Sequence, residues 1–439
     1  MTATARSSRL RRISALVGAV ALTSIGLTAC GGSSDSGASA ACSGDTAINT
    51  YFGDGGKPAG QGQTVKVGML LAMTGSGSSY GEVMSQGAEL AAKQIQAACG
   101  PDFEISIGDH ESGSVPAAVA AARKLISQEG INVLQTSFGG VSEAIIPLVQ
   151  QNKVLTLQGG GTSPGQIGKD YLWNTRQLFA DPSIPGGLAW VAQEYPDAKR
   201  MAVVGTLENG INAQKELIPT IWPTVADGGT VVANEQHEVG IKDFGQIIAK
   251  LQSARPDVIW IFEQGGDNAT FMKALRRAGV TAPVVSSETG GEEVCKLAPK
   301  EFDTVIALGE NYDPANPNPF NAQFVEEYNA AYGKNPDIFA ANYYEEMFVF
   351  WELVKRVIAD DGDTTSGEQL QKALEADTTF KSVYGGTADE VGTMSIDEKT
   401  HLPVKPMGVY TISDCKLTQV ATITEVPEGG DPASGVSEG

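Results

Sequence analysis

The chain has 439 residues, with 52 acidic and 31 basic side chains and a net charge of −21. This acidic balance argues against nucleic-acid binding, because affinity for nucleic acids comes largely from Lys and Arg contacts to phosphates. The length suggests two domains.

Residues 1–29 have the parts of a bacterial export signal. Four arginines and no acid come first, and an apolar stretch follows that is shorter than the ~20 residues of a spanning helix. Leu27-Thr28-Ala29 then precede Cys30, which resembles a lipobox in which Cys30 is lipidated and becomes the new N-terminus. An ordinary cleaved signal or a short membrane anchor is the alternative, and Arg11-Arg12 leaves the Sec or Tat export route open.

Two further segments lack the composition of a folded core. Residues 30–61 begin with small polar side chains, which predicts a flexible tether. Residues 426–439 are acidic and rich in Gly and Pro, which predicts a disordered tail. We therefore expect an exported protein that is lipid-anchored at the outer face of the cytoplasmic membrane.

Four cysteines follow Cys30, namely Cys42, Cys99, Cys295 and Cys415. An even number in an exported chain predicts disulfides, and three pairings are possible. No CxxC occurs, so we expect no metal site. The three histidines are far apart, match no ligand spacing and are interpreted as structural: His110, His237 and His401.

Apolar runs and helical patterns alternate along the chain. Strands are predicted at residues 65–73, 103–109, 132–137 and 154–158, with helices at 80–98, 115–129 and 141–151. A second series has strands at 200–206, 257–263 and 283–288, with helices at 244–254 and 269–279. Beyond residue 310 the pattern is mainly helical until the strand-like stretch 406–423. Near-continuous apolar strands between helices predict an α/β fold with two lobes, each a parallel sheet covered on both faces.

Glycine-rich loops follow five of the predicted strands, at residues 73–81, 136–142, 158–165, 263–268 and 286–291. In open parallel sheets, ligands bind beyond the carboxyl ends of the strands. Glycine allows a close approach of backbone to ligand, and helix N-termini favour anionic groups. These loops are therefore the predicted ligand-binding region.

Two enzymatic interpretations of these loops are weak. Gly75-x-Gly77 is not followed by the third glycine of a dinucleotide fingerprint, and no P-loop occurs, so we expect no cofactor. GTSPG (161–165) fits the GxSxG pattern of serine hydrolases, but Pro164 lacks the N–H that the oxyanion hole needs. GSSYG (77–81) leaves Ser79 as a candidate nucleophile, with His237 or His401 as its base.

A binding protein explains more of the chain. Residues 65–95, 133–164 and 255–288 resemble, in order, segments of the periplasmic binding proteins of branched-chain amino-acid ABC importers. The resemblance extends over residues 62–425 and implies a type I periplasmic-binding-protein fold, with two doubly wound parallel-sheet lobes and three crossover hinge segments.

The resemblance also implies the lobe boundaries and the disulfides. Lobe 1 would comprise residues 62–180 and 311–400, and lobe 2 residues 181–310 and 401–425. Cys295 and Cys415 would then share lobe 2, and Cys42 would lie at the entrance of lobe 1 with Cys99. The implied pairs are therefore Cys42–Cys99 and Cys295–Cys415.

The family's ligand site can be transferred position by position. The implied ligand-binding residues are Tyr80, Phe138, Gly139, Ser142, Gly160, Gly161, Thr162, Asn209, Gln264 and Glu288. Gly160 and Thr162 would hold a ligand carboxylate, and Glu288 an α-ammonium group. Gly139 replaces a serine of the family, while Asn209-Gly210 and Gln264 replace tyrosines. Leucine is therefore a doubtful ligand, and the identity of the ligand stays open.

We therefore expect an extracytoplasmic lipoprotein without catalytic activity. It would capture an amino acid or an amide-like molecule as a monomer and deliver it to the permease of an ABC importer. The alternatives are a ligand-sensing receptor domain of the same fold and a secreted serine hydrolase that uses Ser79.

Overall fold

A computed structural model describes residues 47–53, 60–177, 183–207, 209–287, 291–303, 305–405, 407–426 and 429–438, all within one compact unit. The predicted signal (1–29), Cys30 and Cys42 lie outside these residues. Within the described chain, no helix combines the length and apolarity that a membrane crossing requires.

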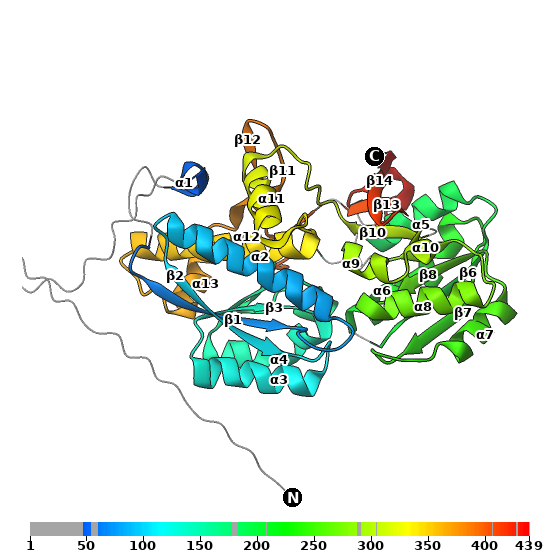
Figure 1. Ribbon diagram of the computed structural model, residues 1–439, viewed down its shortest axis with the longest axis horizontal. Coiled ribbons are helices and arrows are strands. Elements are labelled where there is room, and N and C mark those ends of the chain that lie inside the picture. The colour runs from blue at the N-terminus through cyan, green and yellow to red at the C-terminus, as the bar shows by residue number, and fades with distance from the viewer. Residues whose placement is uncertain are drawn as a thin grey trace, which may run out of the picture. The chain divides into compact units, whose positions relative to one another are not determined.

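The first sheet has five parallel strands in the order β2-β1-β3-β4-β5. Its strands are β1 (Thr64–Leu71), β2 (Asp102–Asp109), β3 (Val133–Thr136), β4 (Leu155–Gln158) and β5 (Leu172–Asn174). The helices around it are α2 (Ser78–Ala97), α3 (Val115–Lys124), α4 (Gly139–Asn152) and α12 (Ile338–Ala359), with the π-helical turn η1 (Leu125–Glu129) after α3. Helices α2 and α12 lie on one face and α3 and α4 on the other (Figure 1).

Apolar side chains on both faces of this sheet form the core of lobe 1. The central strands β3 and β4 are buried at every residue, as expected for parallel strands covered on both sides. Helix α12 is buried along nearly its whole length and comes close to α2, where a Cβ at Gly87 would lie 2.2 Å from the carbonyl oxygen of Ala340. A glycine is therefore needed at this helix crossing.

The second sheet has eight strands in the order β15-β14-β13-β10-β9-β8-β6-β7. Its strands are β6 (Arg200–Thr206), β7 (Thr230–His237), β8 (Val258–Phe262), β9 (Val284–Ser286), β10 (Val305–Glu310), β13 (Met407–Ser413), β14 (Lys416–Ile423) and β15 (Val436–Glu438). Five neighbouring strands, β7, β6, β8, β9 and β10, are parallel. Strands β13, β14 and β15 add to the β10 edge in antiparallel orientation. The sheet of lobe 2 is therefore mixed, not purely parallel as the sequence predicts.

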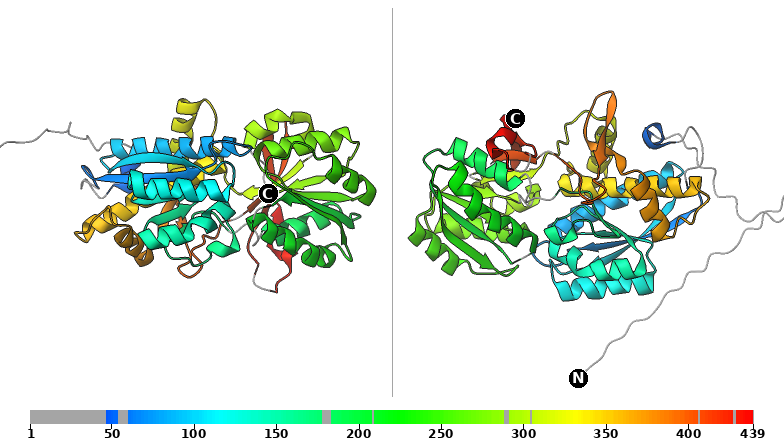
Figure 2. Two further views of the ribbon diagram at one scale, coloured as in Figure 1. Left: turned by 90° about the horizontal axis from the view of Figure 1, so that it is seen from below. Right: turned by 180° about the vertical axis from the view of Figure 1, so that it is seen from behind.

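Helices cover both faces of this sheet as well, and Figure 2 shows the strands between them. They are α5 (Ser183–Glu194), α6 (Asn209–Val225), α7 (Gly245–Ala254), α8 (Gly265–Arg277), α9 (Gly291–Leu297) and α10 (Pro299–Phe302). Val203 of β6 packs in one core with α5 and α6, and its neighbour Val204 packs in another with α7 and α8. This alternation of successive side chains between two faces produces the layered lobe.

The remaining elements belong to lobe 1 or to its connections. They are α1 (Ala47–Phe52), the 3-10 turn η2 (Pro164–Gln166), α11 (Pro319–Tyr332), α13 (Gly367–Ala376) and the strands β11 (Thr379–Thr387) and β12 (Glu390–Ser395). β11 and β12 form a hairpin that projects from lobe 1 (Figures 1 and 2). The hairpin and strands β5, β7, β10 and β15 were not predicted from the sequence.

The predicted flexible tether is wrong for α1. Phe52 is 2% exposed, and its ring centroid lies 4.9 Å from that of Phe320 and 4.6 Å from that of Phe348. Lys355 Nζ also donates to the carbonyl oxygen of Phe52 over 2.7 Å. Burial of this aromatic ring fixes the segment against lobe 1.

The predicted disordered tail is wrong for residues 432–438. The short 3-10 helix η3 (Pro432–Gly435) leads into β15, which pairs antiparallel with β14. Asp431 caps η3 by accepting from the N–H of Ala433. Edge pairing explains why an acidic, Gly- and Pro-rich segment is ordered here.

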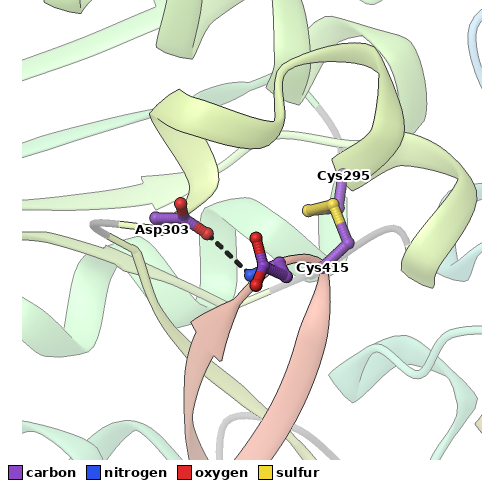
Figure 3. Close-up of a disulfide and its surroundings, with 4 residues drawn as sticks. Cys295, Asp303 and Cys415 are labelled. Carbon is purple, nitrogen blue, oxygen red and sulfur yellow. Dashed lines mark hydrogen bonds between the residues drawn. A yellow bond between two sulfur atoms is a disulfide. The ribbon is translucent and has the colours of Figure 1, made fainter.

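The Cys295–Cys415 disulfide is confirmed. It joins α9 to the turn between β13 and β14, where Asp303 Oδ1 also accepts from the N–H of Asp414 at 3.0 Å (Figure 3). Cys99 is disulfide-bonded too, but Cys42 lies outside the described residues, so the Cys42–Cys99 pair stays a prediction.

The chain passes between the two sheets three times. The described parts of these crossovers are residues 175–177, 311–318 and 396–405. They meet the N-terminal half of α12, where the adjacent Glu345 and Glu346 are both fully buried. Polar and charged side chains of the crossovers are thus brought into the protein interior, where they need partners.

Two buried ion pairs lie at this junction. Arg176 Nε is 3.9 Å from Glu310 Oε1, and Lys405 Nζ is 3.5 Å from Glu345 Oε2. Glu346 instead accepts hydrogen bonds from Thr175 and Gln135. Burial raises the pKa of Glu346 to about 8, so this carboxyl is mostly protonated at neutral pH.

We predict that Glu346→Gln makes stability less dependent on pH. The folded protein holds a proton on Glu346 that the unfolded chain releases, so its contribution is complete below pH ~4.5 and is lost as pH rises to about 8. Wild type should lose roughly 1.4 kcal/mol more per pH unit in this window than the variant. Urea unfolding from pH 5 to 9 measures the difference. Glu326→Gln, on the exposed face of α11, is the control, and parallel curves for wild type and Glu346→Gln would contradict the prediction.

Candidate functional site

A cavity lies where the loops of the two sheets face each other. Lobe 1 lines it with Tyr80, Phe138, Gly139, Gly160, Gly161, Thr162, Arg176 and Phe339, and lobe 2 with Gly210, Ile211, Gln214, Phe262, Gln264 and Ser287. Most of these residues follow strands β3, β4, β5, β8 and β9 directly. The position agrees with the rule that open α/β sheets bind ligands beyond the carboxyl ends of their strands.

Seven of the ten residues assigned to the ligand site by resemblance line this cavity: Tyr80, Phe138, Gly139, Gly160, Gly161, Thr162 and Gln264. Ser142 does not, because it is buried in α4, where its hydroxyl donates to the carbonyl oxygen of Phe138. Glu288 and the side chain of Asn209 lie outside the described parts of the chain, although their neighbours Ser287 and Gly210 line the cavity.

The loop that follows β4 is organised by its own glutamine. Gln158 Oε1 accepts from the N–H of Gly160 at 2.7 Å and of Gly161 at 3.2 Å. Thr162 Oγ1 donates to the carbonyl oxygen of Gln177 at 2.8 Å. The expected donors for a ligand carboxylate are thus engaged within the protein in this structure.

The glycines of this loop differ in purpose. A Cβ at Gly160 would lie 2.7 Å from Ser137 Cβ and 2.9 Å from Tyr343 Oη, so this position requires glycine for packing. A Cβ at Gly161 would meet nothing closer than 3.4 Å, where its neighbours are Gly139 N and Phe138 Cα. Gly161 therefore borders the cavity without being needed to hold the loop.

The N-terminus of α4 is exposed to the cavity by an unusual backbone conformation. Phe138 precedes the helix with φ +62° and ψ 130°, a region that bulky residues rarely adopt. Gly139, the first residue of α4, lines the cavity. The partial positive charge of a helix N-terminus therefore lies beside the space for a ligand.

Arg176 is the only charged residue among the described cavity-lining residues, and sequence analysis missed it. It is 2% exposed, its Nη1 donates to the carbonyl oxygen of Gly160 at 2.8 Å, and its guanidinium lies 5.1 Å from the ring centroid of Phe339. Arg176 follows the three-residue strand β5, which is too short to show a pattern. The position of Arg176 just before a predicted lobe boundary could have indicated that it lies near the cavity between the lobes.

Four of the described residues that line the cavity are aromatic. Phe138, Phe339 and Tyr80 come from lobe 1 and Phe262 from lobe 2. The Tyr80 ring lies 4.9 Å from the Phe339 ring and 6.3 Å from the Phe138 ring, centroid to centroid. These walls suit a ligand with an apolar body.

Two hydrogen bonds connect the lobes beside the cavity. The N–H of Gly265 donates to Tyr80 Oη at 2.9 Å, and the N–H of Gly266 donates to the carbonyl oxygen of Ser76 at 3.1 Å. Gly265 has φ +50°, and a Cβ there would lie 2.2 Å from the Ser76 oxygen. Glycine at 265 is therefore needed for this close approach between the lobes.

The serine-hydrolase alternative lacks a base near its nucleophile. Ser79 lies in the first turn of α2 and does not line the cavity. Each described histidine has other partners: His110 contacts Ser137, His237 contacts Glu263, and the His401 ring stacks on Trp173. Among described residues, no hydrogen bond joins Ser79 to a histidine.

Electrostatics of two histidines agree with structural roles. Burial lowers the pKa of His110 to about 4, so it is neutral. Burial is the largest single effect on His237 and opposes its protonation, but the hydrogen bond to Glu263, the charge of Glu263 and the bond to the Glu238 carbonyl together raise its pKa. Across the described ranges, no group of His, Cys, Asp and Glu has the arrangement of a metal site.

Comparison with known proteins explains this geometry. The model of a protein family described as periplasmic binding protein matches residues 64–416, which is most of the chain. The chain belongs to the periplasmic binding protein family. Family and fold predictions are thereby confirmed, and members of this family are binding proteins that act outside the cytoplasm.

Two relatives illustrate the similarity. A Leu/Ile/Val-binding protein homolog 1 from Brucella melitensis is 26% identical over 343 residues, covering 76% of this chain and 86% of the relative. A leucine-, isoleucine-, valine-, threonine- and alanine-binding protein from Pseudomonas aeruginosa is 24% identical, covering 79% of this chain and 89% of the relative.

Solved structures share the fold of this periplasmic binding protein. A leucine-binding protein from Thermotoga maritima superposes with a TM-score of 0.70 at 21% identity, covering 83% of this chain and 99% of the other. A solute-binding protein from Rhodopseudomonas palustris in complex with 3,4-dihydroxybenzoic acid gives 0.70 at 22% identity, covering 84% of this chain and 99% of the other.

We predict opposite outcomes for alanine at the two neighbouring loop glycines. Gly160→Ala should destabilise the protein by about 1–3 kcal/mol, because the new methyl group overlaps Ser137 and Tyr343. Gly161→Ala should change stability by less than ~1 kcal/mol, since its methyl group would make ordinary contacts. Urea unfolding of both variants measures this, and equal losses would show that the packing difference is not real.

Proposed function

We propose that this protein is the solute-binding lipoprotein of an ABC importer. It captures an amino acid or a similar small polar ligand between its lobes and presents the closed complex to the permease. The observation that carries this proposal is the cavity lined by both lobes and bordered by the Tyr80–Gly265 hydrogen bond. A ligand that contacts both walls favours the closed arrangement through its differential affinity.

The lobe 1 wall supports binding of an anionic group. Arg176 supplies a guanidinium and Gly139 the N-terminus of α4, both at the cavity. Arginine and helix N-termini both favour carboxylates. In our proposal the anionic group lies nearer the N-terminus of α4 at Gly139 than the family's site around Gly160 and Thr162, because the N–H of Gly160 is already bonded. Arg176 lines the same wall and is itself paired with Glu310 and with the carbonyl oxygen of Gly160.

The names of the relatives favour small carboxylates as ligands. The two relatives are named for branched-chain and small amino acids, and one neighbouring structure contains a dihydroxybenzoic acid. All of these ligands combine a carboxylate with a compact body. For an amino acid, we propose Glu288 as the partner of the ammonium group.

A ligand screen tests the proposal. Residues 31–439, which keep Cys42 and lack the lipidated Cys30, should be expressed and tested by thermal shift and calorimetry against amino acids, small amides, urea and aromatic acids. We expect a rise in melting temperature with one group of small carboxylates, because a ligand that binds only the folded state stabilises it by mass action. Gly161→Ala should reduce the affinity of that ligand roughly tenfold, since it adds a methyl group at the cavity.

A substitution on the exposed surface provides a control for the Gly161→Ala measurement. Lys372→Gln, on the exposed face of α13, should bind the same ligand as tightly as wild type. A wild-type protein that binds no member of the panel would overturn the proposal.

We propose that Cys30 carries the lipid anchor. The full-length protein, expressed in a bacterium with a lipoprotein pathway, should sediment with membranes, whereas Cys30→Ser should not. Membrane fractionation with immunodetection measures this. Equal membrane association of both proteins would show that the anchor is not attached at Cys30.

A further inference from the structure

Gln214 on α6 is a buried side chain with an unused acceptor. It lines the cavity and is 8% exposed. Its Nε2 donates to the carbonyl oxygen of Gly210 at 3.2 Å, which fixes the orientation of the amide. Its Oε1 has no hydrogen-bond partner within the described chain.

Gln264 adds a second acceptor to the same wall. It precedes α8 without capping the helix through its side chain, and it lines the cavity. Its Oε1 is also buried without a partner among the described residues. The unpaired buried acceptors on cavity-lining residues are therefore these two amide oxygens, both from lobe 2.

A buried acceptor without a partner destabilises a folded protein, because it has lost its hydrogen bonds to water. An apolar residue of similar size would avoid this cost at position 214. The side chain of Gln214 already has the helix carbonyl of Gly210 for its N–H group, so only the oxygen lacks a partner. A partner that the chain itself does not supply would satisfy it.

We propose that Gln214 and Gln264 select ligands that carry O–H or N–H donors on the end facing lobe 2. This inference rests on the proposed function and narrows its ligand class. The ligand is a small carboxylate whose donor group lies at the opposite end of an apolar body, as in a hydroxybenzoic acid. Its carboxylate faces Arg176 and Gly139, its body lies between the aromatic rings, and its donors face the two amide oxygens.

The wall recognises donors through neutral groups. An amide oxygen accepts from a hydroxyl and from an ammonium group, whereas a carboxylate favours the cation. Discrimination at Gln214 therefore depends on the presence of a donor more than on its charge. Two pairs of probes separate hydroxyl from ammonium donors at the end opposite the carboxylate: 3,4-dihydroxybenzoate with benzoate, and 4-(aminomethyl)benzoate with 4-methylbenzoate.

The decisive variant is Gln214→Met. Methionine has similar length and helix propensity but lacks the acceptor. The apo variant should be at least as stable as wild type. By calorimetry, the donor-bearing member of the pair that binds should lose affinity roughly tenfold or more, as expected for a lost buried hydrogen bond. The donor-free member should bind both proteins equally and more weakly than its partner binds wild type.

Gln252→Met is the matched control, because Gln252 lies on the exposed face of α7 in the same lobe. It should leave both affinities unchanged. If Gln214→Met destabilises the apo protein, or weakens both members of a pair equally, Gln214 has a packing role and the inference is overturned. If wild type binds both members of each pair equally, donor selection fails while the proposed function stands. If wild type binds none of the four carboxylates but does bind another member of the wider panel, the inference about Gln214 and Gln264 is overturned and the proposed function stands.

Discussion

The side chain of Asn342 connects the glycine loop after β4 to the crossovers between the lobes. Its amide group donates to the carbonyl oxygen of Gly159 at 3.1 Å and to Glu310 Oε2 at 2.9 Å. Its oxygen accepts from Tyr384 Oη at 2.8 Å and Lys405 Nζ at 3.1 Å. All four hydrogen-bonding positions of the amide are therefore used inside the protein, which is the maximum for this side chain.

This network constrains how the lobes can move. Glu310 precedes the second crossover and Lys405 belongs to the third, while Gln177 of the first crossover accepts from the N–H of Lys405 at 2.9 Å. Leaving one charge of a buried pair without its partner costs about 3–5 kcal/mol. Lobe rotation that keeps these contacts is therefore strongly favoured over rotation that breaks them. Because Asn342 also contacts Gly159, the hinge and the glycine loop after β4 share one rigid support.

Much of the fold could be predicted because apolar side chains are frequent in the strands, as in β8, which is continuously apolar, and because strands such as β4 and β8 are followed by glycine loops. Strand β7 was missed because its side chains are half exposed and polar, and β5 because it has three residues. The loops that line the cavity were predicted, but the hydrogen bonds of their N–H groups to other parts of the protein were not. Gln158 satisfies Gly160 and Gly161 from two and three residues away, and no periodicity reveals such a contact. Gln214 lies within a helix that has prolines at 219 and 223, and nothing in its spacing distinguishes it.

The two walls of the cavity differ in what they can bind. Helices α4 and α8 begin at the cavity, and so does α6, whose first turn lines it with Gly210 and Ile211. All three N-termini favour negative charge. At α8, however, the first N–H groups already donate to Tyr80 and Ser76 of the opposite lobe. We assign the anionic group of the proposed ligand to lobe 1, because the N-terminus of α4 and Arg176 both line the cavity there. The side chains of lobe 2 that remain available, Gln214 and Gln264, present oxygens. In the proposed complex, a ligand with a carboxylate at one end and donors at the other therefore has a single favourable orientation between the two walls.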